Sequence, residues 1–179
     1  MTKVVDLEKA RIDMAAKRGY RNWATQFGEG FGSETRVSHI SLKTLSFLTL
    51  GRGKSTFYLH DLIMNLLSLG SGFEFDELGP EDKMGVVDRY LFILDQIRFE
   101  YMKRLGWLES YPGEEYALVE LIIHFDELAP GIQAKIPSLS RKHPAYHKFS
   151  NMGDFEKGEL IRQLIPKALK EIQDHSTSL

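Results

Sequence analysis

Apolar side chains recur at helical spacing from the start of the chain. Leu7, Ala10 and Met14 lie three or four residues apart, and the pattern continues to Phe27, where the glycine-rich stretch GEGFGS breaks it. Residues at these spacings share one face of an α-helix. The pattern therefore predicts an amphipathic helix that ends before the glycines, which we interpret as a hinge or a close backbone crossing.

Two shorter helices are predicted next. Ser33 is a suitable N-cap for a helix that ends at Gly51, and Ser55 is a suitable N-cap for one that continues to the glycines of residues 70–72. Serine hydroxyls accept hydrogen bonds at helix starts, and glycine readily adopts the left-handed conformation at helix ends. Since the loops are short, residues 1–72 should form one topological unit.

The strongest helix pattern runs from Pro80 to Leu105. A proline suits the first position of a helix. Apolar residues then alternate at spacings of three and four, and Arg98 takes the one slot in this register that is not apolar: Met84, Val87, Leu91, Leu94, Tyr101 and Leu105. This stripe predicts the central helix of a bundle, packed in the core of its own chain. Pairing with the same helix of a second copy is the alternative.

The C-terminal part is predicted to hold two helices and a long loop. The first helix runs from about Glu114 to Leu128 and ends near Pro130. Residues 130–153 hold three of the 6 prolines and show no periodicity, and such a length is unusual in a compact domain unless the loop binds something or moves. Asp154 should cap the last helix, and Pro166 should kink or restart it.

These elements predict the all-α class. We expect an irregular bundle of five to seven helices with one long loop before the C-terminal helix. A chain of 179 residues with 42% hydrophobic residues can bury a substantial core, so we expect a single domain over residues 1–179. Residues 1–72 and 73–179 are possible sub-units.

Composition excludes several kinds of site. The chain has no cysteine, which excludes disulfides, thiolate catalysis and cysteine-ligated metals. No apolar run approaches the roughly 18 residues that a membrane span needs. We therefore expect a cytoplasmic protein without a membrane partner.

Charge is unevenly distributed although the net charge is only −2. Formal charges give +5 for residues 1–60, −10 for residues 61–130 and +3 for residues 131–179. The acidic middle and basic ends suggest attraction between segments of one chain or head-to-tail attraction between chains. Ordinary solvated faces are the alternative.

The stretch GRGKST, residues 51–56, shares its ending with a P-loop. A P-loop also needs a glycine five positions before its Gly-Lys-Ser ending, and that position is Leu48, inside a segment with helical rather than strand spacing. A P-loop is therefore not predicted. A weaker alternative is an anion site in which Arg52, Lys54 and Ser55 surround the N-terminus of a helix.

Glu100, Glu120 and His124 are the candidate metal ligands. Glu120 and His124 stand four residues apart on one face of a predicted helix, and carboxylates and histidines can hold a divalent metal inside a helical bundle. The two Glu-x-x-His motifs of a di-iron bundle are absent. No cofactor is predicted from these residues, a divalent metal stays open, and a half-buried structural histidine is the alternative for His124.

Two other arrangements fall short of a catalytic site. His60 and Asp61 are adjacent, and adjacent side chains on a helix diverge by about 100°, so they cannot form a dyad. The last helix carries two acidic pairs, whose outline resembles the magnesium-binding carboxylates of all-α nucleoside triphosphate pyrophosphohydrolases: Glu156 and Glu159, then Glu171 and Asp174. Both pairs lie in one terminal stretch, so ion pairs along an exposed face are the better interpretation.

Basic and aromatic residues concentrate between residues 140 and 149. The candidate binding residues there are Arg141, Lys142, His143, Tyr146, His147 and Lys148. Such a mixture suits phosphate contacts and stacking, but one basic loop on a nearly neutral domain neutralises few phosphates. We therefore favour a protein partner, such as the acidic segment of a second copy, over nucleic acid.

Taken together, the sequence favours a homodimeric interaction or regulatory protein, because every catalytic arrangement fails on spacing. The alternatives are a bundle enzyme that binds a metal or an anionic ligand through Glu, Asp and His residues, and a nucleic-acid-binding protein. Whether the chain is an enzyme stays open, and binding without catalysis is favoured.

Overall fold

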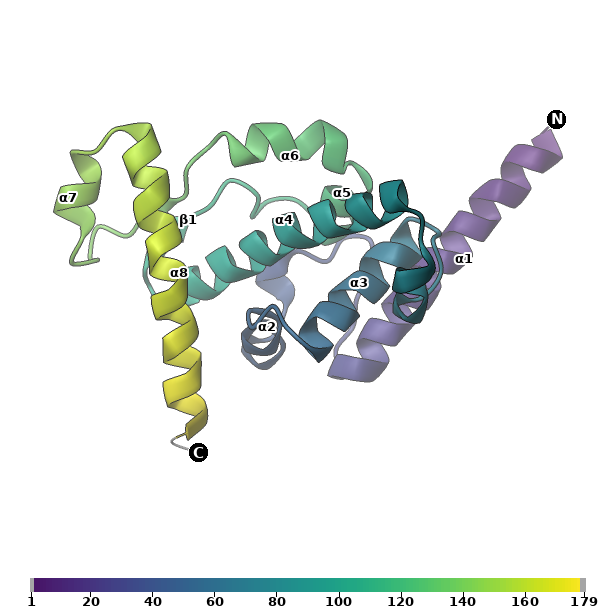
Figure 1. The fold of residues 1–179 in the computed structure, drawn as a ribbon, viewed down its shortest axis with the longest axis horizontal. Coiled ribbons are helices and arrows are strands. Elements are labelled where there is room, and N and C mark those ends of the chain that lie inside the picture. The colour runs from purple at the N-terminus through teal and green to yellow at the C-terminus, as the bar shows by residue number, and fades with distance from the viewer. Residues whose placement is uncertain (1, 178–179) are drawn as a thin grey trace.

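A computed structural model describes residues 2–177 of the chain, and α-helices dominate it (Figure 1). The predicted all-α class is confirmed. In chain order the elements are α1 (Thr2–Phe27), the 3-10 helix η1 (Val37–His39), α2 (Leu42–Leu48), α3 (Lys54–Leu66), the 3-10 helix η2 (Gly72–Glu77), α4 (Pro80–Arg104), β1 (Leu108–Ser110), α5 (Leu118–Ile123), α6 (Phe125–Gln133), β2 (Ser138–Leu139), α7 (Tyr146–Ser150) and α8 (Asp154–Thr177).

Helix α4 lies at the centre of the molecule (Figure 1). Helices α2, α3, α5 and α8 pack against it, and β1 follows it to pair with β2 in a short antiparallel ladder. The core is one contiguous apolar cluster, which removes a large apolar area from water. Its fully buried members include Leu45, Leu48, Leu62, Ile63, Phe92, Ile93, Ile97, Leu118 and Leu121.

The register predicted for α4 is wrong at two positions. Met84 and Leu91 were expected in the core but are 65% and 53% exposed. Helix α4 carries a second apolar stripe at the same spacings, which is the one that faces α3 and α5: Val86, Tyr90, Ile93 and Ile97. Leu94 and Tyr101 of the predicted stripe are buried. Because both stripes have helical spacing, the pattern could not decide which one faces inward.

The helix predicted from Ser33 starts later in the structure. The chain turns after Ser33, forms η1, and enters α2 only at Leu42. Ser41 provides the N-cap, and its hydroxyl oxygen accepts a hydrogen bond from the Thr44 N–H at 3.3 Å. The same kind of cap therefore acts eight residues further along the chain than predicted.

The predicted helix 114–128 is divided into α5 and α6. The break falls at His124, whose φ of −100° and ψ of 30° lie outside the helical region. Helix α6 then continues through Pro130 to Gln133. Pro130 is the sixth residue of α6, so the helix does not end at the proline, as the sequence predicted, but three residues after it.

The predicted loop 130–153 also contains regular structure. Strand β2 pairs with β1, so that Leu139 lies opposite Leu108, and α7 follows at residues 146–150. Helix α8 then runs without a break from Asp154 through Pro166 to Thr177, and Asp154 is its first residue rather than its cap. In Figure 1 α8 crosses the C-terminal end of α4.

The first half of α1 projects away from the rest of the molecule (Figure 1). Residues 7–14 are all exposed, and the first buried side chain of the described residues is Ala15. The second half of α1 packs on α3. The two helices are close at Gly19, because a Cβ atom added to this glycine would lie only 3.0 Å from the Asn65 Cβ. Within residues 2–177, every helix is too short or too polar to span a lipid bilayer.

Candidate functional site

A cavity of about 360 Å³ lies between α1, α3 and the start of η2. This volume falls in the range of roughly 300 to 1,000 Å³ that small-molecule sites occupy. Its lining combines several aromatic rings with a few polar groups: Trp23, Phe27, Phe57, Tyr58 and Phe73, then Asn22, Gln26, Asp61 and Ser71. We call it the aromatic pocket.

The turn after α3 shapes the aromatic pocket. Ser68 and Gly70 have positive φ values of 57° and 101°, so the chain reverses and brings η2 back onto α3. A Cβ on Gly72 would lie 2.9 Å from the Phe57 Cε2 atom and 3.1 Å from the Asp61 Cβ. Glycine at position 72 therefore allows the backbone to close one side of the pocket.

Aromatic rings in contact with one another form most of the wall. Trp23 and Phe27 have ring centroids 4.7 Å apart, and Phe27 contacts Tyr58 at 5.5 Å. On the other side Phe57 contacts Phe73 at 4.7 Å. Trp23 is 3% exposed, whereas Phe73 is 85% exposed. Phe73 therefore belongs to the open rim of the pocket and Trp23 to its buried wall.

Asp61 is the one carboxylate among the lining residues, and it is 7% exposed. One oxygen accepts a hydrogen bond from the Gly72 N–H at 2.8 Å, and the other accepts from the Asn22 amide at 3.0 Å. Both donors are neutral. Arg18 donates to the Asn65 side chain at 3.0 Å, and none of the ion pairs among the described residues involves Asp61.

His60, next to Asp61, faces a different part of the molecule. Its ring lies 4.5 Å from that of Phe75 and 4.8 Å from that of Tyr90, and burial lowers the pKa of its imidazole below the usual 6.5. The expectation that His60 and Asp61 diverge agrees with this geometry. The sequence did not identify Asp61 as a pocket residue, because its hydrogen-bond partners come from α1 and η2, which are distant from it in the chain.

The predicted anion site at the start of α3 is only partly available. Arg52 and Lys54 are exposed, but Ser55 is fully buried and closes a turn. Its hydroxyl accepts from the Arg52 N–H at 3.1 Å and donates to the Arg52 carbonyl oxygen at 2.9 Å. Gly53, not Ser55, occupies the N-cap position. The prediction of a Ser55 cap is therefore wrong, because its hydroxyl bonds to the preceding turn instead.

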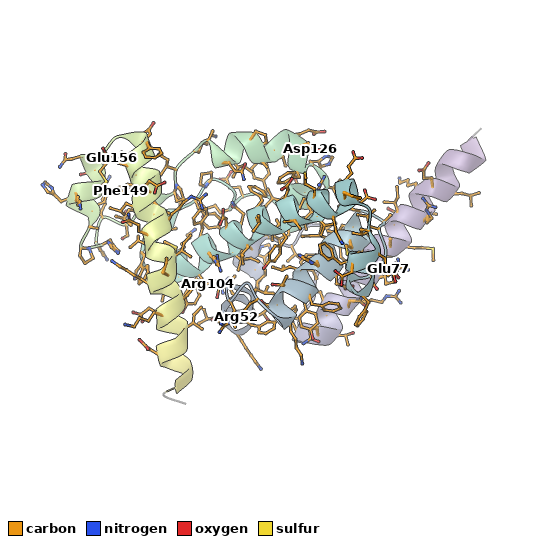
Figure 2. All side chains as sticks on the ribbon, viewed as in Figure 1. Arg52, Glu77, Arg104, Asp126, Phe149 and Glu156 are labelled. Atoms are coloured by element: carbon orange, nitrogen blue, oxygen red, sulfur yellow. The ribbon has the colours of Figure 1, made fainter. Side chains whose placement is uncertain are left out.

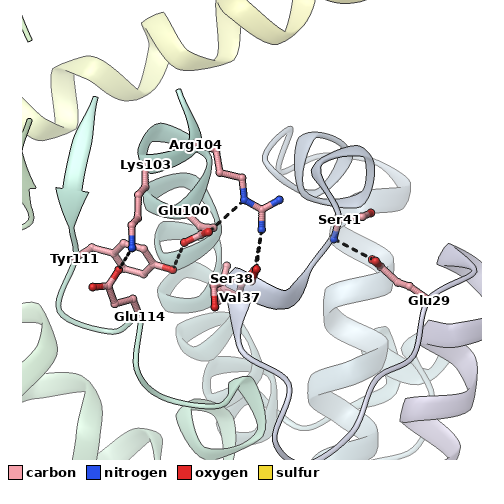
Figure 3. Close-up of polar contacts among 9 residues, drawn as sticks. All are labelled: Glu29, Val37, Ser38, Ser41, Glu100, Lys103, Arg104, Tyr111 and Glu114. Carbon is pink, nitrogen blue, oxygen red and sulfur yellow. Dashed lines mark hydrogen bonds and ion pairs between the residues drawn. The ribbon is translucent and has the colours of Figure 1, made fainter. Parts of the chain in front are cut away.

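Both carboxylate oxygens of Glu100 accept hydrogen bonds from neighbouring side chains, so they do not form a cluster with other acidic residues (Figure 3). Tyr111 donates to one carboxylate oxygen at 2.7 Å, and Arg104 donates to the other at 3.2 Å. Arg104 also donates to the Ser38 carbonyl oxygen at 3.2 Å, which ties the segment after α1 to α4. Burial, followed by the charge of Glu100, raises the pKa of Tyr111 well above its ordinary value.

The other candidate metal ligands lie elsewhere. Glu120 and His124 are both exposed, and His124 lies 3.7 Å from Glu127. Within the part of the chain that the structure describes, no three acidic or histidine side chains come close enough to share a metal ion. The structure thus does not bring Glu100, Glu120 and His124 together.

The basic segment 140–149 forms part of an open groove. Arg141 and Tyr146 line this groove of about 560 Å³ beside β2, α7 and α8, together with Lys135 and Lys157. Glu109 and Asp154 also line it, so its charge is mixed. The other candidates of this segment lie on α7 or the turn before it, with Lys142, His147 and Lys148 exposed and His143 half-buried.

The two predicted basic sites lie apart. Figure 2 shows Arg52 near α2, well away from Phe149 on α7. Arg52 and Lys54 therefore do not continue the surface made by Arg141, Lys142 and Lys148. These five residues therefore do not form a single basic surface.

The aromatic pocket is thus the best-defined candidate site, and it was not predicted from the sequence. The sequence pattern of each lining segment is that of an ordinary amphipathic helix or turn, and the pocket forms only where these segments meet in the fold. The chain matches no protein-family model, no curated protein and no solved structure.

Proposed function

We propose that this protein is a binding protein whose aromatic pocket takes an organic cation, such as a substituted ammonium group. The observation that carries this proposal is Asp61, a buried carboxylate that lines an aromatic pocket and is hydrogen-bonded by neutral donors. A carboxylate oxygen can accept more than one hydrogen bond. Asp61 can therefore interact with a ligand while it keeps Asn22 and Gly72.

The aromatic rings favour the same class of ligand. The face of an aromatic ring carries negative electrostatic potential, so it attracts cations, and this attraction reaches about 2 kcal/mol where water is excluded. Apolar substituents on the cation would be buried against Trp23 and Phe57. The lining contains no histidine or other basic group next to Asp61, which supports binding rather than acid–base catalysis.

The test compares a cation with an uncharged molecule of the same shape. Choline and its carbon analogue 3,3-dimethylbutan-1-ol would be titrated into the protein by calorimetry. We expect choline to bind about tenfold more tightly, which corresponds to about 1.4 kcal/mol. Equal affinities would contradict the proposed cation site, and so would the absence of binding by every cation tested.

A second titration distinguishes the two sources of such a cation. A peptide that carries trimethyl-lysine would represent a protein partner, and choline represents a free metabolite. Tighter binding of the peptide than of choline supports the interaction function that the sequence favours. Tighter binding of choline assigns the pocket to a small molecule instead.

Phe73 offers a variant that should leave the fold intact, because its side chain is 85% exposed. Phe73→Ala should weaken choline binding about three- to tenfold through the loss of one ring. Phe155→Ala is the matched control, since Phe155 is 81% exposed on α8. Asp61→Asn removes the negative charge, so it should bring the affinities of choline and its neutral analogue close together. The ratio of these two affinities is the readout, because it does not depend on the stability of the variant.

A further inference from the structure

The projecting half of α1 carries an exposed stripe of apolar and basic residues. Leu7 and Met14 lie seven residues apart and are 71% and 69% exposed. Arg11 lies between them on the same helical face, and Arg18 follows Met14 by four residues. Within the described part of the molecule, no side chain buries Leu7 or Met14. We call this set the α1 stripe.

The outer face of α4 carries a stripe of the same spacing and opposite charge. Met84 and Leu91 also lie seven residues apart and are 65% and 53% exposed. Asp88 lies between them, and Glu81 precedes Met84 by three residues; both are exposed. This is the stripe that the sequence placed in the core or in a pair between two copies. We call it the α4 stripe.

The two stripes match when their helices lie antiparallel. Leu7 then faces Leu91, and Met14 faces Met84. The two apolar pairs then lie two helical turns apart, a spacing that keeps them on one face of each helix. Burial of these four side chains would remove apolar surface that each single chain leaves in water.

The charges match in the same register. Arg11 faces Asp88. Arg18, whose Nε donates to the Asn65 side chain of α3 at 3.0 Å, lies at the position opposite Glu81. None of the ion pairs among the described residues involves Arg11, Asp88 or Glu81. Parallel helices would place Arg18 opposite Asp95 instead, which already lies 3.7 Å from Arg162. The antiparallel arrangement is therefore the better match.

We propose that two copies of the chain form a dimer in which the α1 stripe of each copy packs on the α4 stripe of the other. The projecting half of α1 and the first turns of α4 lie at the same end of the molecule (Figure 1). Two such ends can therefore approach each other about a two-fold axis and make the contact twice. This proposal does not depend on the ligand of the aromatic pocket.

The contact is small. Specific protein interfaces bury about 800 Å² on each partner, and two short helix faces per copy make a modest interface of mixed character. We therefore expect a dimer that dissociates in the micromolar range and weakens as salt screens the charged pairs. Sedimentation velocity over a series of protein concentrations, at low and high salt, measures this equilibrium.

Charge reversal tests the pairing itself. Arg11→Glu and Asp88→Arg should each weaken self-association at least about tenfold, because each places like charges together twice in the dimer. When the two variants are mixed, both contacts have opposite charges again. The mixture should therefore form a heterodimer with about the affinity of the unaltered protein.

Matched controls place the same charge changes outside the stripes. Lys43→Glu on α2 and Glu120→Arg on α5 alter exposed residues, and they should leave the dimer unchanged. The proposal is wrong if the unaltered chain stays monomeric at about 100 μM, or if the mixed variants fail to associate. Equal loss of association in the controls would also overturn it.

Discussion

At the scale of single residues, Glu100 illustrates how a buried charge is accommodated. It is 4% exposed, and each of its oxygens accepts a hydrogen bond, from Tyr111 and from Arg104. Because the pKa of Tyr111 is raised by burial and by Glu100, the phenol stays protonated and remains a donor. Glu100 therefore acts as a structural link between α4, Tyr111 directly after β1, and, through Arg104, η1.

Tyr111→Phe should therefore destabilise the protein clearly. The substitution keeps the ring but leaves one oxygen of a buried carboxylate without its donor. Hydrogen bonds to charged groups contribute about 1.5 to 3 kcal/mol, so we expect a loss of that size in the free energy of unfolding, measured in urea. Tyr116→Phe removes a hydroxyl from a half-buried tyrosine, and it should change stability by less than about 0.5 kcal/mol. A similar loss in both variants would show that the Glu100 contact has no special weight.

At the scale of helices, the sequence was sufficient where a segment had one apolar stripe and a clear stop. Helix α1 ends at Phe27 beside Gly28, whose φ is 69°, as the pattern predicted. It was insufficient for α4, where two stripes compete for the core. The aromatic pocket could not be predicted from the sequence for a related reason. Phe57 and Tyr58 fit a helical pattern equally well as core residues, and only the reversal at Gly70 makes them pocket walls.

Prolines show the limit of local rules within helices. Pro166 was expected to kink or restart the last helix, and α8 does not restart there, because it is continuous on both sides of the proline. A proline inside a helix has no N–H to donate and its ring crowds the preceding turn. Ile165 and Ala168, on either side, are 9% and 4% exposed. Their burial favours the continuous helix and offsets the cost of the proline.

Pro166→Ala should consequently stabilise the protein. The alanine N–H can donate to the Arg162 carbonyl oxygen, and Pro166 itself is exposed, so no core contact is lost. We expect an increase of about 1 to 3 kcal/mol in the free energy of unfolding, together with greater helicity by circular dichroism. Lys167→Ala, at the next exposed position of α8, controls for the general effect of alanine. No difference between the two variants would mean that α8 accommodates the proline without cost.

At the scale of the whole molecule, the features proposed for binding gather at one end. The projecting half of α1 and the first turns of α4 lie there, next to α3, whereas α7 and α8 lie at the other end (Figure 1). The aromatic pocket is lined mainly by α1 and α3. The second half of α1 forms a wall of the pocket and its first half forms the stripe proposed for dimer contacts. One helix therefore connects both proposed interactions.

This arrangement predicts a protection pattern in hydrogen–deuterium exchange that depends on protein concentration. Residues 7–14 are exposed on all sides of a projecting helix, and helical segments shorter than about 12 residues are marginal in water without packing. At concentrations where the chain is monomeric, their amides should exchange far faster than those of the buried Ile63 and Met64 on α3.

When the protein is concentrated, protection of residues 7–14 should rise while that of α3 stays constant, because only the stripe gains contacts on dimerisation. The Arg11→Glu variant should show fast exchange at every concentration, since its stripe is repelled by Asp88 of the second copy. Slow exchange of residues 7–14 in the dilute unaltered protein would contradict this account. It would mean that the first half of α1 is already packed within the single chain, and the stripe would then not be free to bind a second copy.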